Sequence, residues 1–340
     1  MSFDLRFAVT RPVLNTPFLD LLRSGKAFML SGHEHPDGDC VGSQVGLFHL
    51  LKGLGAQVSI CNPDPVARSL LFLEDRTPIG NYKSSGELPG FDVLVLLDCA
   101  QLSRLGAMQD AVRALDPQIA VIDHHVGSED GDGTQTWIDV DAAATGILVY
   151  DLYKALDVEI SPAAAEALFV SVVADTGWFR YSNTDSRAML VAEEMIRLGA
   201  EPHTIYDRIY RDRDPRSVAL LSESLATAQF RASGRLAFAV LDQALMLRTN
   251  QAGFDTDEVL EPIRSVAGVG VAALFKELVD GQVKISFRSM GDVDVQAIAA
   301  ELGGGGHKKA AGVTLRMSLS AAIDAVESRV LAALDGERPT

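Results

Sequence analysis

The segment from Ser31 to Asp39 concentrates side chains that can hold divalent cations. Its nine residues include two histidines and three carboxylates. An apolar run before it, residues 27–30, predicts a strand, and an apolar-periodic run after it, residues 41–54, predicts a helix. We therefore expect the segment at the carboxyl end of a strand, where open α/β sheets bind ligands. An Asp-rich loop that only caps the helix is the alternative, because Asp and Ser are favoured N-caps.

Three further groups of polar residues follow the ends of apolar elements. Two groups follow apolar runs that are typical of buried strands in a parallel sheet, and one ends a helix that is apolar almost all round. The groups are Asp98 after residues 91–97, Asp123, His124 and His125 after residues 119–122, and Asp175 after residues 163–174. Each alone could be a helix cap, a core histidine or a turn residue. Because parallel strands end at one edge of their sheet, we expect all four polar sites to converge there on a metal centre.

The donor atoms of these sites indicate the metal and the reaction. Carboxylate oxygens with two or three imidazoles and no thiolate suit Mn²⁺ or Mg²⁺, and the imidazoles favour Mn²⁺. The candidate ligands exceed what one ion needs once water and substrate bind, so we expect two ions. Two ions ~3.5–4 Å apart activate a water and stabilise both the attacking and the leaving oxygen of a phosphoester. The predicted chemistry is therefore phosphoester hydrolysis.

Composition restricts the class of protein and of substrate. A chain of 340 residues is long enough for two domains, and 47% hydrophobic with 22% charged residues is typical of a soluble protein. The net charge of −16 argues against a protein that tracks long nucleic acid through a basic groove. The three cysteines are scattered, which favours a reduced, cytoplasmic location. The sequence shows no signal peptide and no apolar run near the ~20 residues that span a bilayer, so we expect a location away from membranes.

The order of the expected elements predicts two α/β domains. Strands alternating with helices up to about residue 190 indicate a parallel sheet, with residues 126–141 as a polar loop. Residues 191–230 are expected to form a helical connector. A smaller α/β domain follows over residues 231–340, with strands near 235–241, 269–275 and 282–288 and helices near 256–265, 293–302 and 319–334. The first domain accordingly covers residues 1–190.

A glycine-rich segment in the second domain, Gly303–Gly312, is a candidate for substrate binding. Its four consecutive glycines would let the backbone approach a ligand and present N–H groups to anionic oxygens, with a histidine and two lysines as further donors. A plain flexible turn is the alternative. An arginine and a serine at the end of a predicted strand could hold a terminal phosphate. The expected substrate contacts are Arg288, Ser289, Gly304, Gly305, Gly306 and His307.

These motifs together resemble the DHH phosphoesterase family. Its name-giving motif is matched by Asp123 to His125, its His-x-x-Pro-Asp-x-Asp motif by His33 to Asp39, and two further motifs by Asp98 and Asp175. Gly303–Gly312 resembles the signature of the associated DHHA1 domain. The resemblance covers nearly the whole chain and is closest to the bifunctional oligoribonuclease/PAP phosphatase (nanoRNase) subgroup. It implies an α/β parallel-sheet DHH domain and a smaller α/β DHHA1 domain, with the active site in the cleft between them.

The resemblance also implies a role for each motif residue. Six residues would hold the two ions: His33 and Asp37 the first, Asp39, His124 and Asp175 the second, and Asp98 both. His125 would face the scissile phosphate as an electrostatic partner or proton donor, and Asp123 would orient an imidazole through a hydrogen bond. His35 has no role in the motif and is expected on the surface.

By resemblance, the function would be Mn²⁺-dependent hydrolysis of short oligoribonucleotides and dephosphorylation of 3′-phosphoadenosine 5′-phosphate (PAP). A phosphodiesterase for cyclic dinucleotides or their linear dinucleotide products is the alternative enzyme. A nucleotide-binding sensor is the alternative outside catalysis. A processive single-strand exonuclease and a family II pyrophosphatase are disfavoured, the first by the acidic chain and the second by the glycine-rich domain. The expected partners are short RNA or small nucleotides, neither long duplexes nor membranes, and a homodimer is an open alternative.

Overall fold

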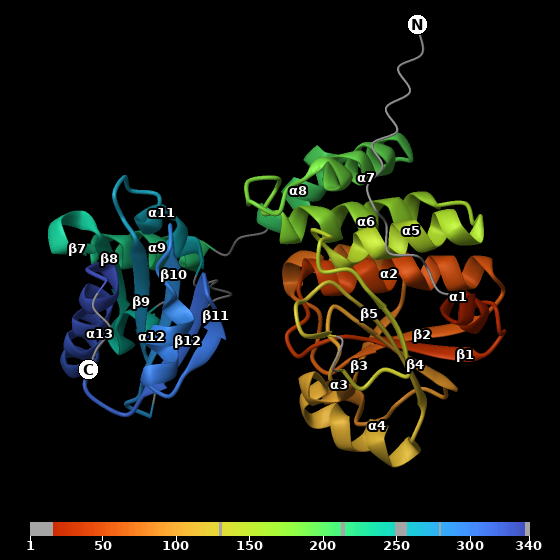
Figure 1. Ribbon diagram of the computed structural model, residues 1–340, viewed down its shortest axis with the longest axis horizontal. Coiled ribbons are helices and arrows are strands. Elements are labelled where there is room, and N and C mark those ends of the chain that lie inside the picture. The colour runs from red at the N-terminus through yellow and green to blue at the C-terminus, as the bar shows by residue number, and fades with distance from the viewer. Residues whose placement is uncertain (1–15, 129–130, 212–214, 249–256, 279, 337–340) are drawn as a thin grey trace, which may run out of the picture. The chain divides into compact units, whose positions relative to one another are not determined.

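The computed structural model describes residues 16–128, 131–211, 215–248, 257–278 and 280–336. The chain divides into two compact units, Met1–Asp212 and Arg213–Thr340 (Figure 1). Each unit has its own six-stranded sheet and its own hydrophobic core.

Unit 1 is built on a sheet in which all neighbouring strands are parallel. The order is β3-β2-β1-β4-β5-β6, with β1 Ala27–Ser31, β2 Gln57–Asn62, β3 Ile79–Asn81, β4 Val93–Leu97, β5 Gln118–Asp123 and β6 Gln135–Ile138. Every residue of β4 is buried, as its unbroken apolar sequence predicts for a central parallel strand. The strand order reverses between β1 and β4, which is the topological switch point where open α/β sheets bind ligands.

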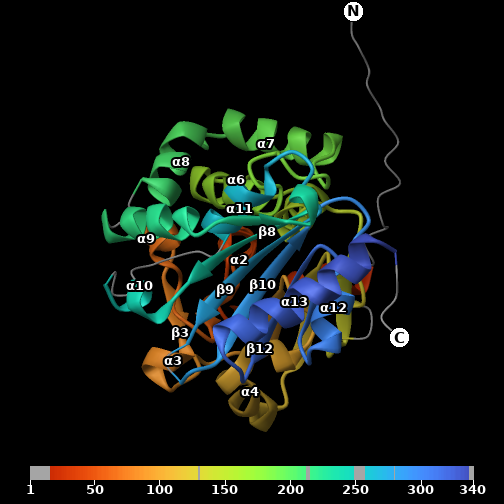
Figure 2. The ribbon, with the colours of Figure 1, turned by 90° about the vertical axis from the view of Figure 1, so that its left-hand side faces the viewer.

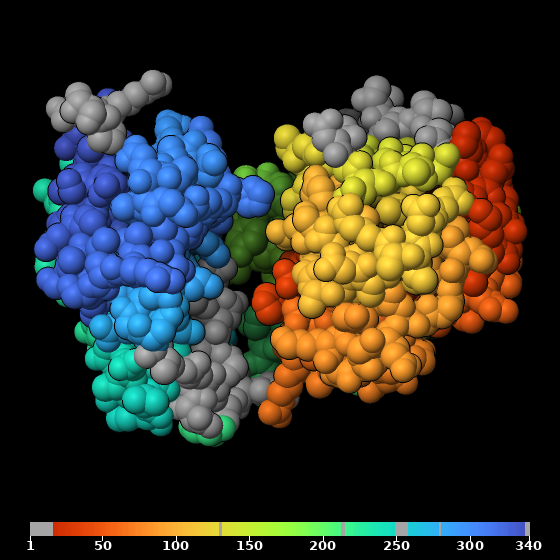
Figure 3. All heavy atoms as spheres, turned by 90° about the horizontal axis from the view of Figure 1, so that it is seen from below, coloured from red at the N-terminus to blue at the C-terminus, as the bar shows by residue number. Residues whose placement is uncertain are grey.

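Helices and short 3₁₀ segments cover both faces of this sheet. They are α1 Thr16–Leu22, α2 Gly38–Gly53, η1 Arg68–Asp75, α3 Tyr82–Ser85, η2 Leu102–Met108, α4 Gln109–Leu115, α5 Thr145–Leu156, α6 Pro162–Asp175, α7 Ser186–Arg197 and α8 Pro202–Tyr210. Figure 1 shows α2 on one face beneath α5 and α6, with α7 outside them and α4 on the opposite face. Within unit 1, the segments coloured orange to yellow, which include α3 and α4, form most of the surface seen from below (Figure 3).

Helix α2 lies close against α6 because glycines line the contact. A Cβ atom at Gly42 would lie 2.4 Å from the carbonyl oxygen of Ala167, and one at Gly46 would lie 2.5 Å from a methyl group of Leu168. The close packing brings the N-terminus of α2 next to the C-terminus of α6, where Gly38 faces Ala174. Asp37, Asp39 and Asp175 are thereby placed at one end of the helical layer.

Unit 2 is a mixed sheet with helices on both faces. The order is β11-β12-β10-β9-β8-β7, and only β8 and β9 pair in parallel. The strands are β7 Gln229–Arg231, β8 Leu236–Leu241, β9 Val271–Glu277, β10 Val283–Ser289, β11 Gly305–His307 and β12 Ala310–Leu315. The helical segments are α9 Pro215–Ala226, η4 Ala232–Gly234, α10 Gln243–Arg248, α11 Asp257–Arg264, α12 Val295–Glu301 and α13 Leu319–Leu334. Figure 2 shows α12 and α13 across one face of the sheet.

The predicted fold class, an α/β chain with a parallel sheet in its first part, is confirmed. One local prediction is wrong, and one local alternative does not hold. The expected polar loop 126–141 contains strand β6, which lies at the sheet edge and buries Trp137, so a four-residue edge strand lies within a polar stretch. The glycine-rich segment is not a simple loop, because β11 pairs with β12 as an antiparallel hairpin.

The expected connector, residues 191–230, is divided by the structure. The boundary between the units follows Asp212, so α7 and α8 lie in unit 1 and α9 lies in unit 2. Among the described residues, no helix combines the length and the apolar content that crossing a bilayer requires.

Candidate metal centre

The four polar sites predicted from the sequence lie together at one edge of the unit 1 sheet. Strands β1, β4 and β5 are neighbours, with Ser31 opposite Leu96 and Leu97 opposite Ile122. The residues that follow these strands therefore leave the sheet side by side. The C-terminus of α6 adds Asp175 to the same group.

The first donor group is formed by His33, Asp37 and Asp98. The Nδ1 atom of His33 bonds to the carbonyl oxygen of Glu34 at 2.8 Å. Because a carbonyl oxygen can only accept, Nδ1 carries the proton, and the neutral ring presents the Nε2 lone pair. His33 Nε2 lies 3.3 Å from Asp98 Oδ2 and 4.0 Å from Asp37 Oδ2.

The second donor group is formed by Asp39, His124 and Asp175. The Nδ1 atom of His124 bonds to the carbonyl oxygen of Ala142 at 3.0 Å, so Nε2 presents the lone pair when the ring is neutral. It lies 3.1 Å from Asp175 Oδ2 and 3.5 Å from Asp39 Oδ2. His124 Nε2 is buried without a hydrogen-bond partner among the described residues. A buried lone pair facing carboxylates is what a bound cation would satisfy.

Asp98 lies between the two groups. Its Oδ2 atom faces His33, while its Oδ1 atom lies 3.5 Å from His124 Nε2 and accepts a hydrogen bond of 3.2 Å from the Thr145 hydroxyl. Its φ of 62° places it in the left-handed region, which Asp tolerates better than most residues but which still costs free energy. One carboxylate that presents an oxygen to each group is suited to bridge two ions.

The alternative interpretation of the aspartates as helix caps also holds. Asp37 is the N-cap of α2, and its Oδ1 atom accepts from the backbone N–H groups of Asp39 and Cys40 at 3.0 and 3.1 Å. Asp39 accepts from the backbone N–H groups of Thr145 and Gly146, at 2.7 and 3.2 Å, at the start of α5. Because the N-cap of α5 is an alanine with no capping side chain, Asp39 supplies the cap from another helix. Capping therefore fixes these carboxylates and does not compete with metal binding.

Asp123 and His125 form a pair beside the donor groups, and His125 Nδ1 also lies 3.7 Å from Asp98 Oδ1. Asp123 is buried, accepts from the backbone N–H groups of His124 and His125 at 2.7 and 3.2 Å, and bonds to the Nδ1 atom of His125 at 2.8 Å. The hydroxyl of Ser128 donates to its other oxygen. With Nδ1 held in this way, His125 directs Nε2 outward from a side chain that is 47% exposed.

The electrostatics of the cluster indicate a need for positive charge. Burial, together with the charge of Asp98, raises the pKa of Asp37 and raises that of Asp39 well above its ordinary value. Burial alone would lower the pKa of both histidines, but the neighbouring carboxylates raise it to about 9 for His33 and about 12 for His124. Burial likewise opposes ionisation of Asp98, yet His124 and His33 hold its pKa well below the ordinary range. Divalent cations would supply the same charge compensation and displace those protons.

Sequence comparison places the chain among known proteins. Residues 27–172 match the DHH family, N-terminal domain, and residues 245–332 match the DHHA1 domain. Over 309 residues the chain is 34% identical to the bifunctional oligoribonuclease and PAP phosphatase NrnA of Thermus thermophilus. The aligned residues cover 91% of this chain and 89% of that protein. This chain belongs to the DHH family.

Two further comparisons extend this assignment. The DHH protein is 26% identical over 324 residues to the cyclic-di-AMP phosphodiesterase GdpP of Geobacillus thermodenitrificans, covering 89% of this chain and 47% of that one. The crystal structure of an exopolyphosphatase-related protein from Bacteroides fragilis has the same fold, with a TM-score of 0.85 and 24% identity over 93% of this chain and 97% of that chain. The resemblance drawn from the motifs is confirmed, and the protein is a phosphoesterase.

Unit 2, which contains the DHHA1 domain and is called the DHHA1 unit below, holds the predicted substrate-contact residues. They lie in the β11–β12 hairpin and in the neighbouring strand β10. A Cβ atom at Gly304 would lie 2.2 Å from the carbonyl oxygen of Gly312, and one at Gly306 would lie 2.6 Å from that of Ala310. Close packing of the hairpin thus explains two of the glycines without a ligand. A Cβ atom at Gly305 would meet nothing within 4 Å among the described residues, and His307 is exposed.

Ser289 and Arg288 end strand β10 in the same unit. The hydroxyl of Ser289 is largely buried and donates to the carbonyl oxygens of Val293 and Lys308 at 2.9 and 3.3 Å. Arg288 donates to the carbonyl oxygen of Phe287 at 2.9 Å. The serine hydroxyl therefore has a structural role, and binding of a phosphate by this pair stays a prediction.

Several contributors to the metal centre were not expected from the sequence. Thr145 bonds to Asp98, Ser171 to Asp39 and Ser128 to Asp123. Cys40 was not counted as a donor, yet its Sγ atom groups with His33 and Asp98 within 4.8 Å. Burial, with the charges of Asp98 and Asp37 beside it, raises the pKa of the Cys40 thiol well above its ordinary value.

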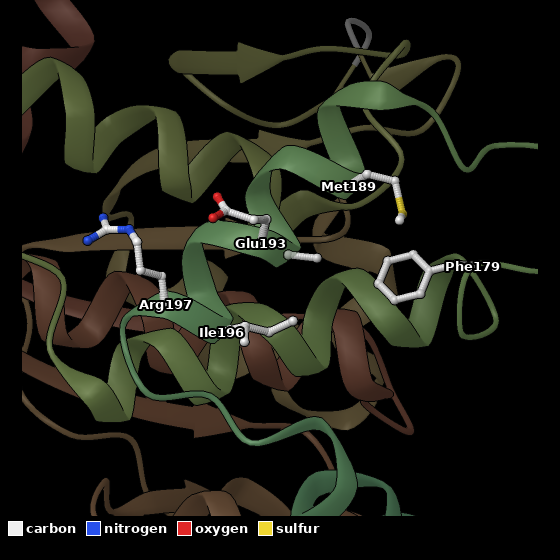
Figure 4. A pocket seen from close by; sticks show the side chains of 6 residues that line it. Phe179, Met189, Glu193, Ile196 and Arg197 are labelled. Atoms are coloured by element: carbon white, nitrogen blue, oxygen red, sulfur yellow. The ribbon is translucent and has the colours of Figure 1, made fainter.

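A hollow of about 290 Å³ along α7 is lined by residues other than those of the metal centre. Its lining combines apolar side chains with one acidic and one basic residue (Figure 4): Phe179, Met189, Ala192, Glu193, Ile196 and Arg197. None of the metal-centre residues lines it. His35, whose side chain is 85% exposed and lies 3.3 Å from Asp64, is also outside the two donor groups.

Proposed function

We propose that this DHH protein is a Mn²⁺-dependent hydrolase that degrades short oligoribonucleotides and dephosphorylates PAP. The observation that carries the proposal is the pair of donor groups that share Asp98, with its two oxygens facing His33 and His124. The 34% identity to an oligoribonuclease and PAP phosphatase along nearly the whole chain supports the choice of substrates.

In this proposal each ion is held by one donor group and by Asp98. His33 and Asp37 would hold the first ion, and Asp39, His124 and Asp175 the second. The orphaned Nε2 atom of His124 and the excess of carboxylates over imidazoles support this fit. When bound, the two ions supply activation of the attacking water and stabilisation of the leaving oxygen. Oxygen donors with two imidazoles favour Mn²⁺ and also allow Mg²⁺.

The remaining side chains of the site act on protons and orientation. Asp123 holds His125 through Nδ1, and this bond, outweighing the effect of burial, raises the pKa of His125. A protonated His125 can donate from Nε2 to an oxygen of the phosphate or of the leaving group. Thr145 and Ser171 orient the carboxylates of Asp98 and Asp39 by hydrogen bonds, so the donor atoms are positioned before substrate binds.

The DHHA1 unit would contribute substrate binding through Gly305 and His307, the exposed residues of the hairpin. A cytoplasmic location is part of the same proposal, and it fits three cysteines that are buried and unpaired.

A second candidate is a phosphodiesterase for cyclic dinucleotides or their linear products. The identity to a cyclic-di-AMP phosphodiesterase over 89% of this chain supports it. The same metal centre would serve either candidate, because each reaction breaks a phosphoester bond.

One kinetic comparison separates the candidates. A labelled dinucleotide, a five-mer, a twenty-mer, PAP and a cyclic dinucleotide are compared by kcat/KM with Mn²⁺ and with Mg²⁺. We expect the dinucleotide, the five-mer and PAP to be turned over faster than the twenty-mer and the cyclic dinucleotide, and Mn²⁺ to give the higher rates. A clear preference for the cyclic dinucleotide would reject the first proposal in favour of the second.

A further inference from the structure

Three aromatic side chains, Trp178, Tyr206 and Tyr210, form an exposed group in unit 1 that we call the aromatic cluster. All three rings contact one another, with ring centroids 5.1 Å apart for Trp178 and Tyr206, 4.7 Å for Tyr206 and Tyr210, and 6.2 Å for Trp178 and Tyr210. Trp178 Nε1 donates to the Tyr210 hydroxyl at 3.1 Å, which fixes the indole against α8. Tyr206 is 45% and Tyr210 37% exposed, so ring surface faces solvent.

The backbone that carries Trp178 is strained. Trp178 and Phe179 have φ values of 57° and 63°, and neither is a residue that favours the left-handed region. Residues held in this region cluster at active sites, ligand-binding sites and switch regions. Hydrogen bonds fix the turn, because Trp178 N–H donates to the carbonyl oxygen of Val173 at 2.8 Å and Phe179 N–H to the Thr176 hydroxyl at 3.2 Å. The chain thus uses a costly turn to place an indole beside two exposed tyrosines.

This turn begins at the metal centre. Asp175 ends α6, and Trp178 is three residues further along the chain, a distance that cannot exceed about 11 Å. Phe169 of α6 packs against both Trp178 and Phe179, with centroids 6.1 and 6.4 Å away, so the turn is anchored to the helix that carries Asp175. A short oligonucleotide whose phosphate lies at Asp175 can therefore reach the aromatic cluster with an adjacent base.

The charge of the chain makes such a contact useful. With a net charge of −16 the protein offers little general attraction to phosphates, so contacts that are not ionic would add to the affinity for more than one nucleotide. Base–aromatic stacking is such a contact, and it tolerates any base because every base has a π face. Arg180 directly follows Phe179 in the chain, and its guanidinium lies 5.8 Å from the ring centroid of Tyr181.

We propose that the aromatic cluster is a stacking site for the base of a nucleotide next to the scissile phosphate. The inference rests on the proposed function in one respect, namely that the scissile phosphate lies at the metal centre. It adds a substrate-binding site within the DHH domain, distinct from the glycine-rich hairpin of the DHHA1 unit.

The first test compares variants on matched substrates. Tyr206→Ala removes the most exposed of the three rings, Tyr206→Phe keeps it, and Leu190→Ala removes an exposed apolar side chain elsewhere on the domain. The substrates are a trinucleotide and the same trinucleotide with each base in turn replaced by an abasic sugar. We expect Tyr206→Ala to lower kcat/KM for the intact trinucleotide about tenfold, since stacking is worth about 1–3 kcal/mol and 1.4 kcal/mol is tenfold. With the stacked base removed, wild type and Tyr206→Ala should be equal, and both controls should match wild type on every substrate.

The second test measures binding without hydrolysis. The chain has two tryptophans, and Trp137 is buried, so Trp137→Phe leaves Trp178 as the reporter. We expect an adenine dinucleotide with an uncleavable methylphosphonate linkage, titrated in Mg²⁺, to quench the fluorescence of this variant. An abasic dinucleotide should quench it much less, and Tyr206→Ala should weaken the quenching.

The outcomes separate the two proposals. Quenching by the dinucleotide in a protein that proves not to hydrolyse RNA would keep the aromatic cluster as a base-binding site and reject the proposed function. Two outcomes would reject base stacking and leave the aromatic cluster with only a packing role beside α6 and α8. One is hydrolysis of RNA with no quenching. The other is an equal loss of kcat/KM on intact and abasic substrates in Tyr206→Ala.

Discussion

Replacing Asp98 by Asn tests the shared carboxylate with the least other disturbance. Asn has the same shape and also tolerates the left-handed backbone found at position 98, so the fold should be unaffected. The amide oxygen can still accept the hydrogen bond from Thr145. What the variant loses is the negative charge and one of the two oxygens that face His33 and His124.

The size of the effect follows from this geometry. Changing a residue that only supports a metal ligand costs about 10–100-fold in metal affinity, so losing a ligand shared by both ions should cost at least that much for each. Metal ions contribute several kcal/mol to charge stabilisation in the transition state, and about 4 kcal/mol corresponds to a thousandfold in rate. We expect Asp98→Asn to lower kcat/KM about a thousandfold and to prevent the binding of two ions at a Mn²⁺ concentration that saturates wild type.

The assay is isothermal titration with Mn²⁺ together with steady-state hydrolysis of a dinucleotide. Asp64→Asn is the matched control, because it removes the same charge from the same unit. Asp64 lies outside both donor groups, and its Oδ1 atom pairs with Lys83 Nζ at 2.8 Å. Asp64→Asn should bind two ions and keep its activity. If Asp98→Asn bound two Mn²⁺ ions with wild-type affinity and kept substantial activity, Asp98 would not be the bridging ligand.

Three further substitutions probe other parts of the protein. Asp123→Asn should lower kcat about 10–100-fold while two ions remain bound, since Asp123 holds His125. Titration calorimetry and steady-state kinetics measure the two quantities, and a loss of bound metal would contradict this expectation. His307→Ala should raise KM much more than it changes metal content, and an unchanged KM would remove the hairpin from substrate binding. Gly306→Ala should destabilise the DHHA1 unit by about 1–3 kcal/mol, because its φ is 136° and a Cβ would lie 2.6 Å from a carbonyl oxygen. In urea unfolding, Gly305→Ala, with open space at its Cβ position, should unfold like wild type, and equal stability of the two variants would be the contrary result.

The sequence alone predicted the elements whose signals are local. Unbroken apolar runs marked β1, β4 and β5, and parallel strands must end at one edge, so the meeting of His33, Asp98 and His124 followed from their positions after these strands. Asp175 was a candidate because it ends an apolar helix, but its place beside the strand ends depends on the packing of α6 against α2. The α/β class and the family followed from the same motifs.

The parts that the sequence did not predict depend on contacts between distant segments. Strand β6 is four residues long at a sheet edge, so its pattern is too short to distinguish from a polar loop. The pairing of Asp39 with the N-terminus of α5 joins residues 106 apart, and that of Asp39 with Ser171 joins residues 132 apart. No local pattern marks Thr145, Ser171 or the proximity of the Cys40 thiol to Asp98, because each contact joins segments that are far apart in the sequence.

Two ions held by donor groups that share one carboxylate are the core of the proposed mechanism. Anomalous diffraction from Mn²⁺-soaked crystals at the manganese absorption edge measures their number and positions directly. We expect two anomalous peaks per chain, one beside His33 and Asp37 and the other beside Asp39, His124 and Asp175, with Asp98 contacting both. A single peak, or peaks away from these residues, would contradict the two-ion mechanism.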